Sequence, residues 1–244
     1  MKPTLNDFYA FLRENFTLFI ERSFNELNPN TKLLWNWHID AIAYELELCR
    51  LGLTKRLIIN LPPRNLKSHC ASVAFVAWLL GHCPSAQIMC ASYAQDLADK
   101  HARDCRTVMM SNWYQNSFPT RLSASKQAIA DFTTIQKGGR RATSVGGVVT
   151  GLGADFIIID DPLKPDEAIS EVRRKTVNEW YDHSLSSRLN DKRNGCIILI
   201  MQRLHEDDLT GHLLKSGGWK ILCLPAIAEE DENTRSRLFV VPAA

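Results

Sequence analysis

The sequence has 244 residues, of which 45% are hydrophobic and 23% are charged, and its formal net charge at pH 7 is +2. These values exclude a disordered or fibrous chain, and the length suits one large α/β domain. No apolar run approaches the roughly 20 residues that a membrane-spanning helix needs, and the net charge is too small to indicate nucleic-acid binding by itself, so any DNA contact must depend on local patches or on a partner.

The cysteines and the N-terminus are typical of a protein of the reducing cytosol. None of the seven cysteines belongs to a C-x-x-C pair, and most lie in apolar runs, which predicts buried free thiols and disfavours a zinc site. The first residues, MKPTLNDFYAFLREN, contain acidic side chains where a signal peptide would have a basic start and an apolar core. We therefore expect a soluble, cytoplasmic protein.

Two helices are predicted before the first strand. Residues 4–27 carry apolar side chains at helical spacing, and a second such pattern extends over residues 31–51, after an Asn-Pro-Asn break. We interpret residues 1–30 as a helical preamble to the main domain. In the second helix, Trp37 and His38 lie just upstream of a strand, where they could bracket a nucleotide base, although core packing is the simpler explanation.

The segment RLIINLPPRNLKS, residues 56–68, is typical of a strand, a tight loop and the start of a helix. In a phosphate-binding loop of this form, backbone N–H groups at the helix start bind phosphate oxygens, a lysine reaches the β- and γ-phosphates, and the next hydroxyl holds Mg²⁺. Lys67 and Ser68 stand in these two places. Leu61 and Leu66 replace the two glycines of the usual pattern, so a strand-loop-helix with an ordinary surface lysine remains the alternative.

Further along, the sequence predicts a basic hairpin. Residues 131–136 and 142–149 are typical of paired strands, and the sequence KGGRR at 137–141 would form the tip. Arg140 and Arg141 are then candidates for an arginine that reaches the γ-phosphate held by a neighbouring subunit. A simple solvent-exposed turn would have the same composition.

The stretch GLGADFIIIDDP, residues 151–162, contains a second strand-and-loop signal. Residues 156–159 are too apolar for an exposed strand and are typical of a strand buried on both faces of a parallel sheet. Asp160 and Asp161 follow at its carboxyl end, where α/β sheets bind ligands. The first aspartate of such a pair holds Mg²⁺ and the second can orient the attacking water. A plain turn into Pro162 is the alternative.

A third apolar strand, residues 196–201, ends at Gln202 and Arg203. ATPases place a residue that senses the γ-phosphate at this kind of strand end. The remaining predicted elements are a strand at 87–91, helices at 95–110, 166–188 and 206–216, and a strand at 220–224. This alternation predicts an α/β fold with a mostly parallel central sheet flanked by helices.

Over about residues 33–228, the chain resembles the ATPase domain of tailed-bacteriophage terminase large subunits. The resemblance rests on four segments in this order along the chain: PPRNLKS, GLGADFIIIDDP, a tryptophan followed by SRL, and IILIMQRLHEDDLTGHLL. The resemblance implies an additional-strand, RecA-like P-loop NTPase fold at residues 31–228, with ATP and Mg²⁺ as ligands. It also implies double-stranded DNA as the translocated substrate, with a small terminase subunit and a portal protein as partners in the bacterial host cytoplasm. A homo-oligomeric ring would form only on assembly.

The resemblance also assigns residues to the nucleotide site. Lys67 corresponds to the Walker A lysine, and Ser68 and Asp160 correspond to the metal ligands. The loop residues that it places at the nucleotide are Pro63, Arg64, Asn65, Leu66, Lys67 and Ser68. The residues that it assigns to catalysis are Asp161, Arg64, Gln202 and Arg203, the last two as the coupling motif.

Three departures from the family pattern bear on activity. Leu66 replaces a glycine that would allow close approach to phosphate. Asp161 stands where most terminases have glutamate, which moves the carboxylate about 1.5 Å, a shift that can cost about 100-fold in rate. The chain ends at Ala244 without a nuclease-like segment, and its tail, residues 229–244, does not resemble the family's linker, so we expect no nuclease activity.

Two alternative functions remain, and the departures favour the first of them. The first is a truncated, weakly active or inactive nucleotide-binding assembly module, such as a prophage remnant would encode. The second is a helicase-type ATPase, which is disfavoured because the Asp160-Asp161-Pro162 corner lacks the Glu-x-[HD] continuation of such enzymes.

Overall fold

An eight-stranded sheet runs through the molecule, in the strand order β3-β4-β5-β2-β6-β7-β1-β8. The computed structural model describes residues 4–128, 130–149 and 151–227; the predicted tail at 229–244 therefore lies outside the described residues. The strands are β1 Arg56–Asn60, β2 Gln87–Ser92, β3 Leu122–Gln127, β4 Asp131–Thr134, β5 Gly139–Ser144, β6 Phe156–Asp160, β7 Cys196–Met201 and β8 Lys220–Cys223.

Six neighbouring strands, from β5 to β8 in the sheet order, are parallel, and only β3 and β4 add antiparallel pairs. Strand β7 lies between β1 and β6, although it comes last of the three in the chain. The register places Asn60 opposite Met201, and Asp160 opposite Ile200. The carboxyl ends of these three strands therefore meet at one edge of the sheet, which is where parallel α/β sheets bind ligands.

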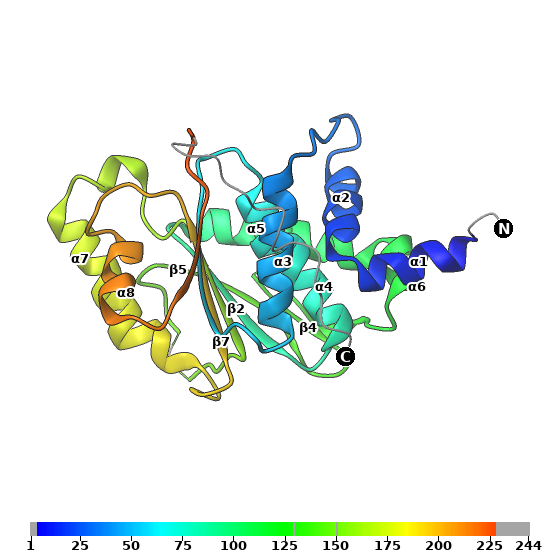
Figure 1. Ribbon diagram of the computed structural model, residues 1–244. Helices are drawn as coiled ribbons and strands as arrows, with labels where there is room; N and C mark the ends of the chain where they lie inside the picture. The colour runs from blue at the N-terminus through cyan, green and yellow to red at the C-terminus, as the bar shows by residue number, and fades with distance from the viewer. Residues whose placement is uncertain (1–3, 129, 150, 228–244) are drawn as a thin grey trace.

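Helices cover both faces of the sheet, as Figure 1 shows: α7 and α8 lie on one side and α1 to α6 on the other. The helices are α1 Leu5–Glu14, α2 Phe16–Leu27, α3 Trp37–Arg50, α4 Phe75–His82, α5 Gln95–Met110, α6 Asn112–Ser117, α7 Glu171–Trp180 and α8 Leu209–Ser216. Two π-helical turns, η1 His69–Ala74 and η3 Tyr181–Leu185, and two short 3₁₀ turns, η2 Pro165–Glu167 and η4 Ser186–Arg188, adjoin them.

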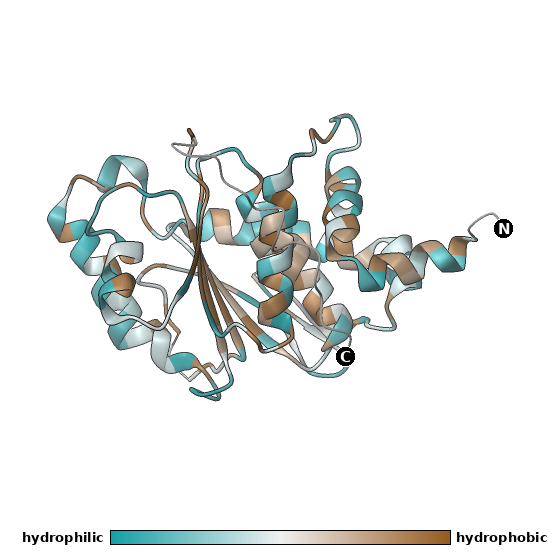
Figure 2. Cartoon of the chain, viewed as in Figure 1, coloured by the Kyte–Doolittle hydropathy of each residue, from teal (hydrophilic) through white to brown (hydrophobic). Residues whose placement is uncertain are grey.

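The apolar strands separate two cores. Along β6, Ile158 faces the core under α1 to α6, whereas Ile157 and Ile159 face the core under α7 and α8. This confirms the prediction of a strand buried on both faces. Helix α4 is buried on every side, from Phe75 to Gly81, and it lies in the apolar centre of the larger layer in Figure 2. A fully packed helix therefore continues the chain after the loop that follows β1 and the π-helical turn η1.

Several helix boundaries differ from the sequence prediction because polar side chains cap the helices. Asn15 divides the predicted helix 4–27 in two: its backbone N–H bonds to Phe11, and its side chain accepts from the Leu18 N–H. Asn36 caps α3 and moves its start from residue 31 to residue 37. The helices predicted at 166–188 and 206–216 likewise begin later, after the capping residues Ser170 and Asp208.

The predicted hairpin is present as the antiparallel pair of β4 and β5, but the prediction that Arg140 and Arg141 lie at its tip was wrong. Strand β5 begins at Gly139, so Arg140 and Arg141 lie within the sheet, and β5 is parallel to β2 with Ile88 opposite Arg140. Gly139 has no Cβ, which lets the Phe132 backbone of β4 approach it closely. Arg140 is only 1% exposed, and it therefore cannot reach a neighbouring subunit from this position.

Within the described part of the chain, none of the helices is both long enough and apolar enough to cross a bilayer.

Candidate functional site

The loop after β1 has a left-handed backbone at two residues that are not glycine. Arg64 has φ 65° and Leu66 has φ 58°. The Asn65 side chain donates to the carbonyls of Pro62 and Pro63, at 3.2 Å each, and so ties the loop to itself. Leu66 also packs against the larger core. The loop thus adopts, without glycine, a conformation for which glycine is usually needed.

The helix that follows this loop starts at Lys67 and Ser68. The carbonyl of Leu66 accepts the N–H of Cys70 at 2.9 Å, the first bond of the turn that leads into η1. The first turn of any helix leaves backbone N–H groups without intrahelical partners, and the helix dipole favours a negative charge there. An anion at this position would therefore contact the backbone N–H groups of the first turn and also the Lys67 side chain.

Asp160, the last residue of β6, is buried and hydrogen-bonded by two serines. Ser68 Oγ donates to Asp160 Oδ1 at 2.9 Å, and Ser72 Oγ donates to Asp160 Oδ2 at 2.7 Å. Burial raises the pKa of the Asp160 carboxyl, and the hydrogen bonds from Ser72 and Ser68 and the positive charges of Lys67 and Arg140 oppose this rise. Arg140, which the hairpin hypothesis placed at the surface, thus acts on the site from inside the core.

Asp161 forms an ion pair with the loop lysine. Lys67 Nζ lies 2.9 Å from Asp161 Oδ2, and the backbone N–H of Gln202 donates to Asp161 Oδ1 at 3.1 Å. Asp161 has φ 45°, a left-handed conformation that aspartate tolerates better than most residues. Burial and the neighbouring Asp160 charge raise the pKa of Asp161, whereas Lys67 lowers it. Residues that follow β1, β6 and β7 therefore meet in one small cluster.

Arg203 is held in its own loop. Its Nε donates to Asp208 Oδ2 at 3.0 Å, and its terminal nitrogen Nη2 reaches the carbonyls of His205 and Glu206 at 3.2 and 3.4 Å. Asp208 is fully buried and also caps α8 through the Gly211 N–H. The sequence analysis did not single out Asp208, although an aspartate directly before an apolar helical pattern is a recognisable capping signal.

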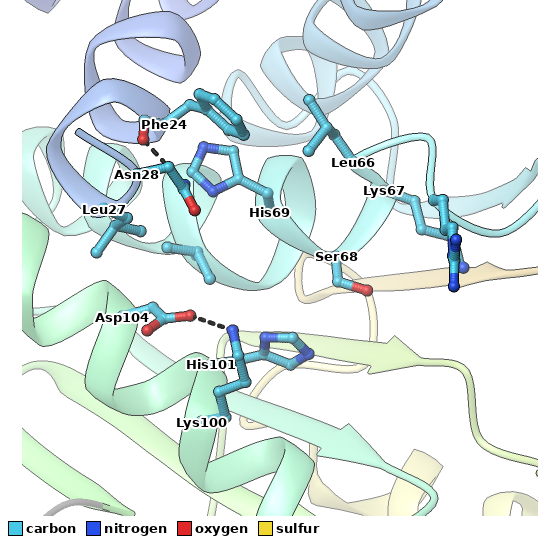
Figure 3. A pocket seen from close by; sticks show the side chains of 12 residues that line it. Phe24, Leu27, Asn28, Leu66, Lys67, Ser68, His69, Lys100, His101 and Asp104 are labelled. Carbon is cyan, nitrogen blue, oxygen red and sulfur yellow. Dashed lines mark hydrogen bonds and ion pairs between the residues drawn. The ribbon is translucent and has the colours of Figure 1, made fainter. Parts of the chain in front are cut away.

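A cavity of about 540 Å³ opens beside Lys67 and Ser68. Figure 3 shows side chains from α2, from the loop and η1, and from α5 around it. They are Phe24, Leu27, Asn28, Arg64, Leu66, Lys67, Ser68, His69, Val73, Lys100, His101 and Asp104. The contributions of α2 and α5 were missed because no local sequence pattern indicates that two distant helices converge on one loop.

The two residues predicted to bracket a base lie outside the lining of this cavity. Trp37 is 44% exposed at the start of α3. His38 lies against the loop: burial lowers the pKa of the His38 imidazole, and the Asn65 backbone opposes that effect. The described residues thus place His38, but not Trp37, against the loop that follows β1.

The oxygen atoms of Ser68 and Asp160 fit a hard cation that binds together with a phosphate ligand. Ser68 Oγ and Asp160 Oδ1 are 2.9 Å apart and offer the oxygen atoms that Mg²⁺ prefers. Among the described residues, no group of three or more His, Cys, Asp or Glu side chains converges in a way that could hold a metal by itself. Mg²⁺ commonly binds through one or two protein oxygens together with substrate phosphates. The two oxygens of Ser68 and Asp160 are therefore enough for this ion, and a larger cluster of protein ligands is not required.

The fold is of the α/β class, with a mostly parallel eight-stranded sheet flanked by helices. It is terminase-like: the crystal structure of the HK97 bacteriophage large terminase matches 91% of this chain with a TM-score of 0.50 and 16% sequence identity. The match covers 45% of the HK97 protein, so this chain spans less than half of that terminase's length. No family model matches the sequence, and no curated protein matches it.

The left-handed conformation of Leu66 predicts a strong dependence on side-chain branching. Leu66→Ile places a β-branched residue at φ 58° and is expected to lower the free energy of unfolding by about 1–2 kcal/mol. Leu222→Ile is the matched control, because Leu222 packs against the same core from a strand, where isoleucine is favoured. Urea denaturation of the two variants measures the difference. Equal effects would contradict the assigned loop conformation.

Proposed function

We propose that this chain is the ATPase domain of a phage terminase large subunit, which binds ATP with Mg²⁺ at the loop after β1 and hydrolyses it to drive double-stranded DNA into a procapsid. The observation that carries the proposal is the pairing of Lys67 with Asp161 and of Ser68 with Asp160, each at 2.9 Å. A lysine and a hydroxyl at a helix start, facing two carboxylates from another strand end, form the arrangement of a P-loop NTPase.

The sheet topology supports the additional-strand class of that fold. Strand β7 is inserted between β1, which carries the loop, and β6, which carries the carboxylates. The insertion places Gln202, at the end of β7, between the two halves of the site, where its backbone N–H bonds to Asp161. A residue so placed can respond to a change at the γ-phosphate.

The described side chains have distinct roles in this proposal. Ser68 and Asp160 would hold Mg²⁺, which when bound neutralises charge on the β- and γ-phosphate oxygens. Phosphate oxygens compete with Asp161 for the Lys67 ammonium, so nucleotide binding would release the Asp161 carboxylate. The freed carboxylate can then orient the attacking water and accept its proton.

Arg64 is the best candidate for a positive charge at the γ-phosphate. It is exposed, lies in the loop and lines the cavity. Arg140 is buried in β5, and Arg203 is engaged by Asp208 at 3.0 Å. An arginine that contacts the transferred phosphoryl group accelerates such reactions by 10³–10⁵, so Arg64 acting in cis would supply this contribution.

The whole-protein context is part of the proposal. The partners would be a small terminase subunit and a portal protein in the bacterial host cytoplasm, and a homo-oligomeric ring would form only on assembly. The second candidate function is a weakly active nucleotide-binding assembly module. Asp161 favours it, because an aspartate in the place of the glutamate of most terminases holds its carboxylate about 1.5 Å further from the attacking water.

Lys67→Ala is expected to abolish stabilisation by nucleotide. Saturating nucleotide with Mg²⁺ at about 100 times its Kd should stabilise the wild-type chain by about 2.7 kcal/mol, which raises the melting temperature by several degrees. The variant should show no such rise in a thermal-shift titration. Lys215→Ala is the control, because Lys215 also forms an ion pair, with Asp207 at 2.8 Å, but on the surface of α8. No nucleotide-dependent shift in the wild type would refute the proposed function.

The two aspartates are expected to differ. Asp160→Asn should weaken nucleotide binding in Mg²⁺ at least about tenfold, because it removes a charged metal ligand. Asp161→Asn should leave binding intact and reduce ATP turnover by about 10²-fold or more, because asparagine cannot accept the proton of the attacking water.

Binding titrations with and without Mg²⁺, together with a phosphate-release assay in the presence of DNA, distinguish the two aspartate variants. The opposite assignment of effects would overturn the roles given to Asp160 and Asp161.

A further inference from the structure

The two oxygens of Asp160 have different surroundings. Oδ1 accepts the Ser68 hydroxyl at 2.9 Å, and Ser68 lines the cavity. Oδ2 accepts the Ser72 hydroxyl at 2.7 Å, and Ser72 is 1% exposed and is not part of the cavity lining. A ligand that enters the cavity can therefore reach Ser68, whereas Ser72 stays enclosed.

Oδ2 is also covered from a second element. His101 of α5 places its Nε2 3.6 Å from Asp160 Oδ2, which is a contact but too long for a hydrogen bond. Ser72 is thus the hydrogen-bond donor that fixes Oδ2.

The backbone explains how one helix supplies both serines. Ser68 precedes η1 and Ser72 lies inside it, four residues later, so the two hydroxyls are one turn apart on the same side of the helix. A short π-helical segment inside a longer helix is a frequent feature of functional sites. Here it aims two hydroxyls at the two oxygens of one carboxylate.

We propose that Ser72 is a positioning residue for the metal aspartate: its hydroxyl fixes Asp160 Oδ2, so that Oδ1, shared with Ser68, is the oxygen presented to Mg²⁺. This inference rests on the proposed function. Without the Ser72 hydroxyl, the carboxylate can rotate about its Cβ–Cγ bond, and the oxygen near Ser68 is no longer held in one orientation. Partners that orient a metal ligand in this way typically change metal affinity by 10- to 100-fold when they are removed.

The test is the Mg²⁺ dependence of nucleotide binding. Thermal shift is measured with a fixed, saturating concentration of a non-hydrolysable ATP analogue while Mg²⁺ is varied. Ser72→Ala is expected to raise the Mg²⁺ concentration at half-maximal stabilisation about tenfold or more. Ser72→Thr keeps the hydroxyl and should retain the wild-type Mg²⁺ midpoint.

A matched control separates positioning from packing. Ser117 is as buried as Ser72, and its hydroxyl bonds to the Trp113 carbonyl at 2.8 Å, away from Asp160. Ser117→Ala should lower the melting temperature of the unliganded protein without moving the Mg²⁺ midpoint. Should Ser72→Ala fail to fold, Ser72→Cys fills the same space with a weaker donor and should still raise the midpoint.

The outcomes separate the two proposals. A wild-type Mg²⁺ midpoint in Ser72→Ala, or in Ser72→Cys where the alanine variant does not fold, would overturn the role of Ser72 while leaving the proposed function intact. Absence of any Mg²⁺-dependent stabilisation in the wild type would overturn both.

Discussion

The site depends on a carboxylate that is buried inside the core. Asp160 is 1% exposed, and burying an ionised carboxylate costs several kcal/mol unless hydrogen bonds and opposite charges compensate. The compensation comes from four places: two hydroxyls on one helix, Lys67 in the loop and Arg140 beneath α5. Lys67 and the two serines belong to the helix start after β1, whereas Arg140 belongs to β5, so two separate parts of the chain oppose the rise in the pKa of Asp160.

Strand order explains why these groups meet. The loop after β1 and the aspartates after β6 are not neighbours, because β7 lies between them. Gln202 directly follows β7, and its backbone N–H donates a hydrogen bond to Asp161 Oδ1. Strand β7 therefore contacts both the strand that carries the loop and the strand that carries the aspartates.

Much of the central sheet could be predicted from the sequence, because a strand buried on both faces requires an uninterrupted apolar run. Residues 156–159 and 196–201 satisfied that rule and became β6 and β7. Helix starts were predicted less well, since single polar caps such as Asn15 and Ser170 set them. Arg140 was misplaced because a Gly-Gly pair indicates a turn, whereas Gly139 actually allows close approach of two strands.

The sequence predicted the loop residues of the cavity but not its other walls. Its lining joins α2, the loop and α5, although α2 ends at Leu27 and α5 begins only at Gln95. Phe19 of α2 packs against Trp113 and Tyr114 of α6, the helix that directly follows α5, at ring distances of 5.2 and 6.1 Å. Such contacts are set by shape complementarity across the layer, for which a single sequence carries no periodic signal.

The left-handed residues in the loop have a consequence for tracing the ancestry of such proteins. Arg64 and Leu66 reach φ values of 65° and 58° without glycine, so the backbone shape of this loop does not depend on the glycine that the usual pattern has at residue 66. A search pattern that demands glycine at this position would pass over such a loop, whereas a pattern written in torsion angles would find it. Glycine-free loops of this type are then best sought by comparing backbone shape.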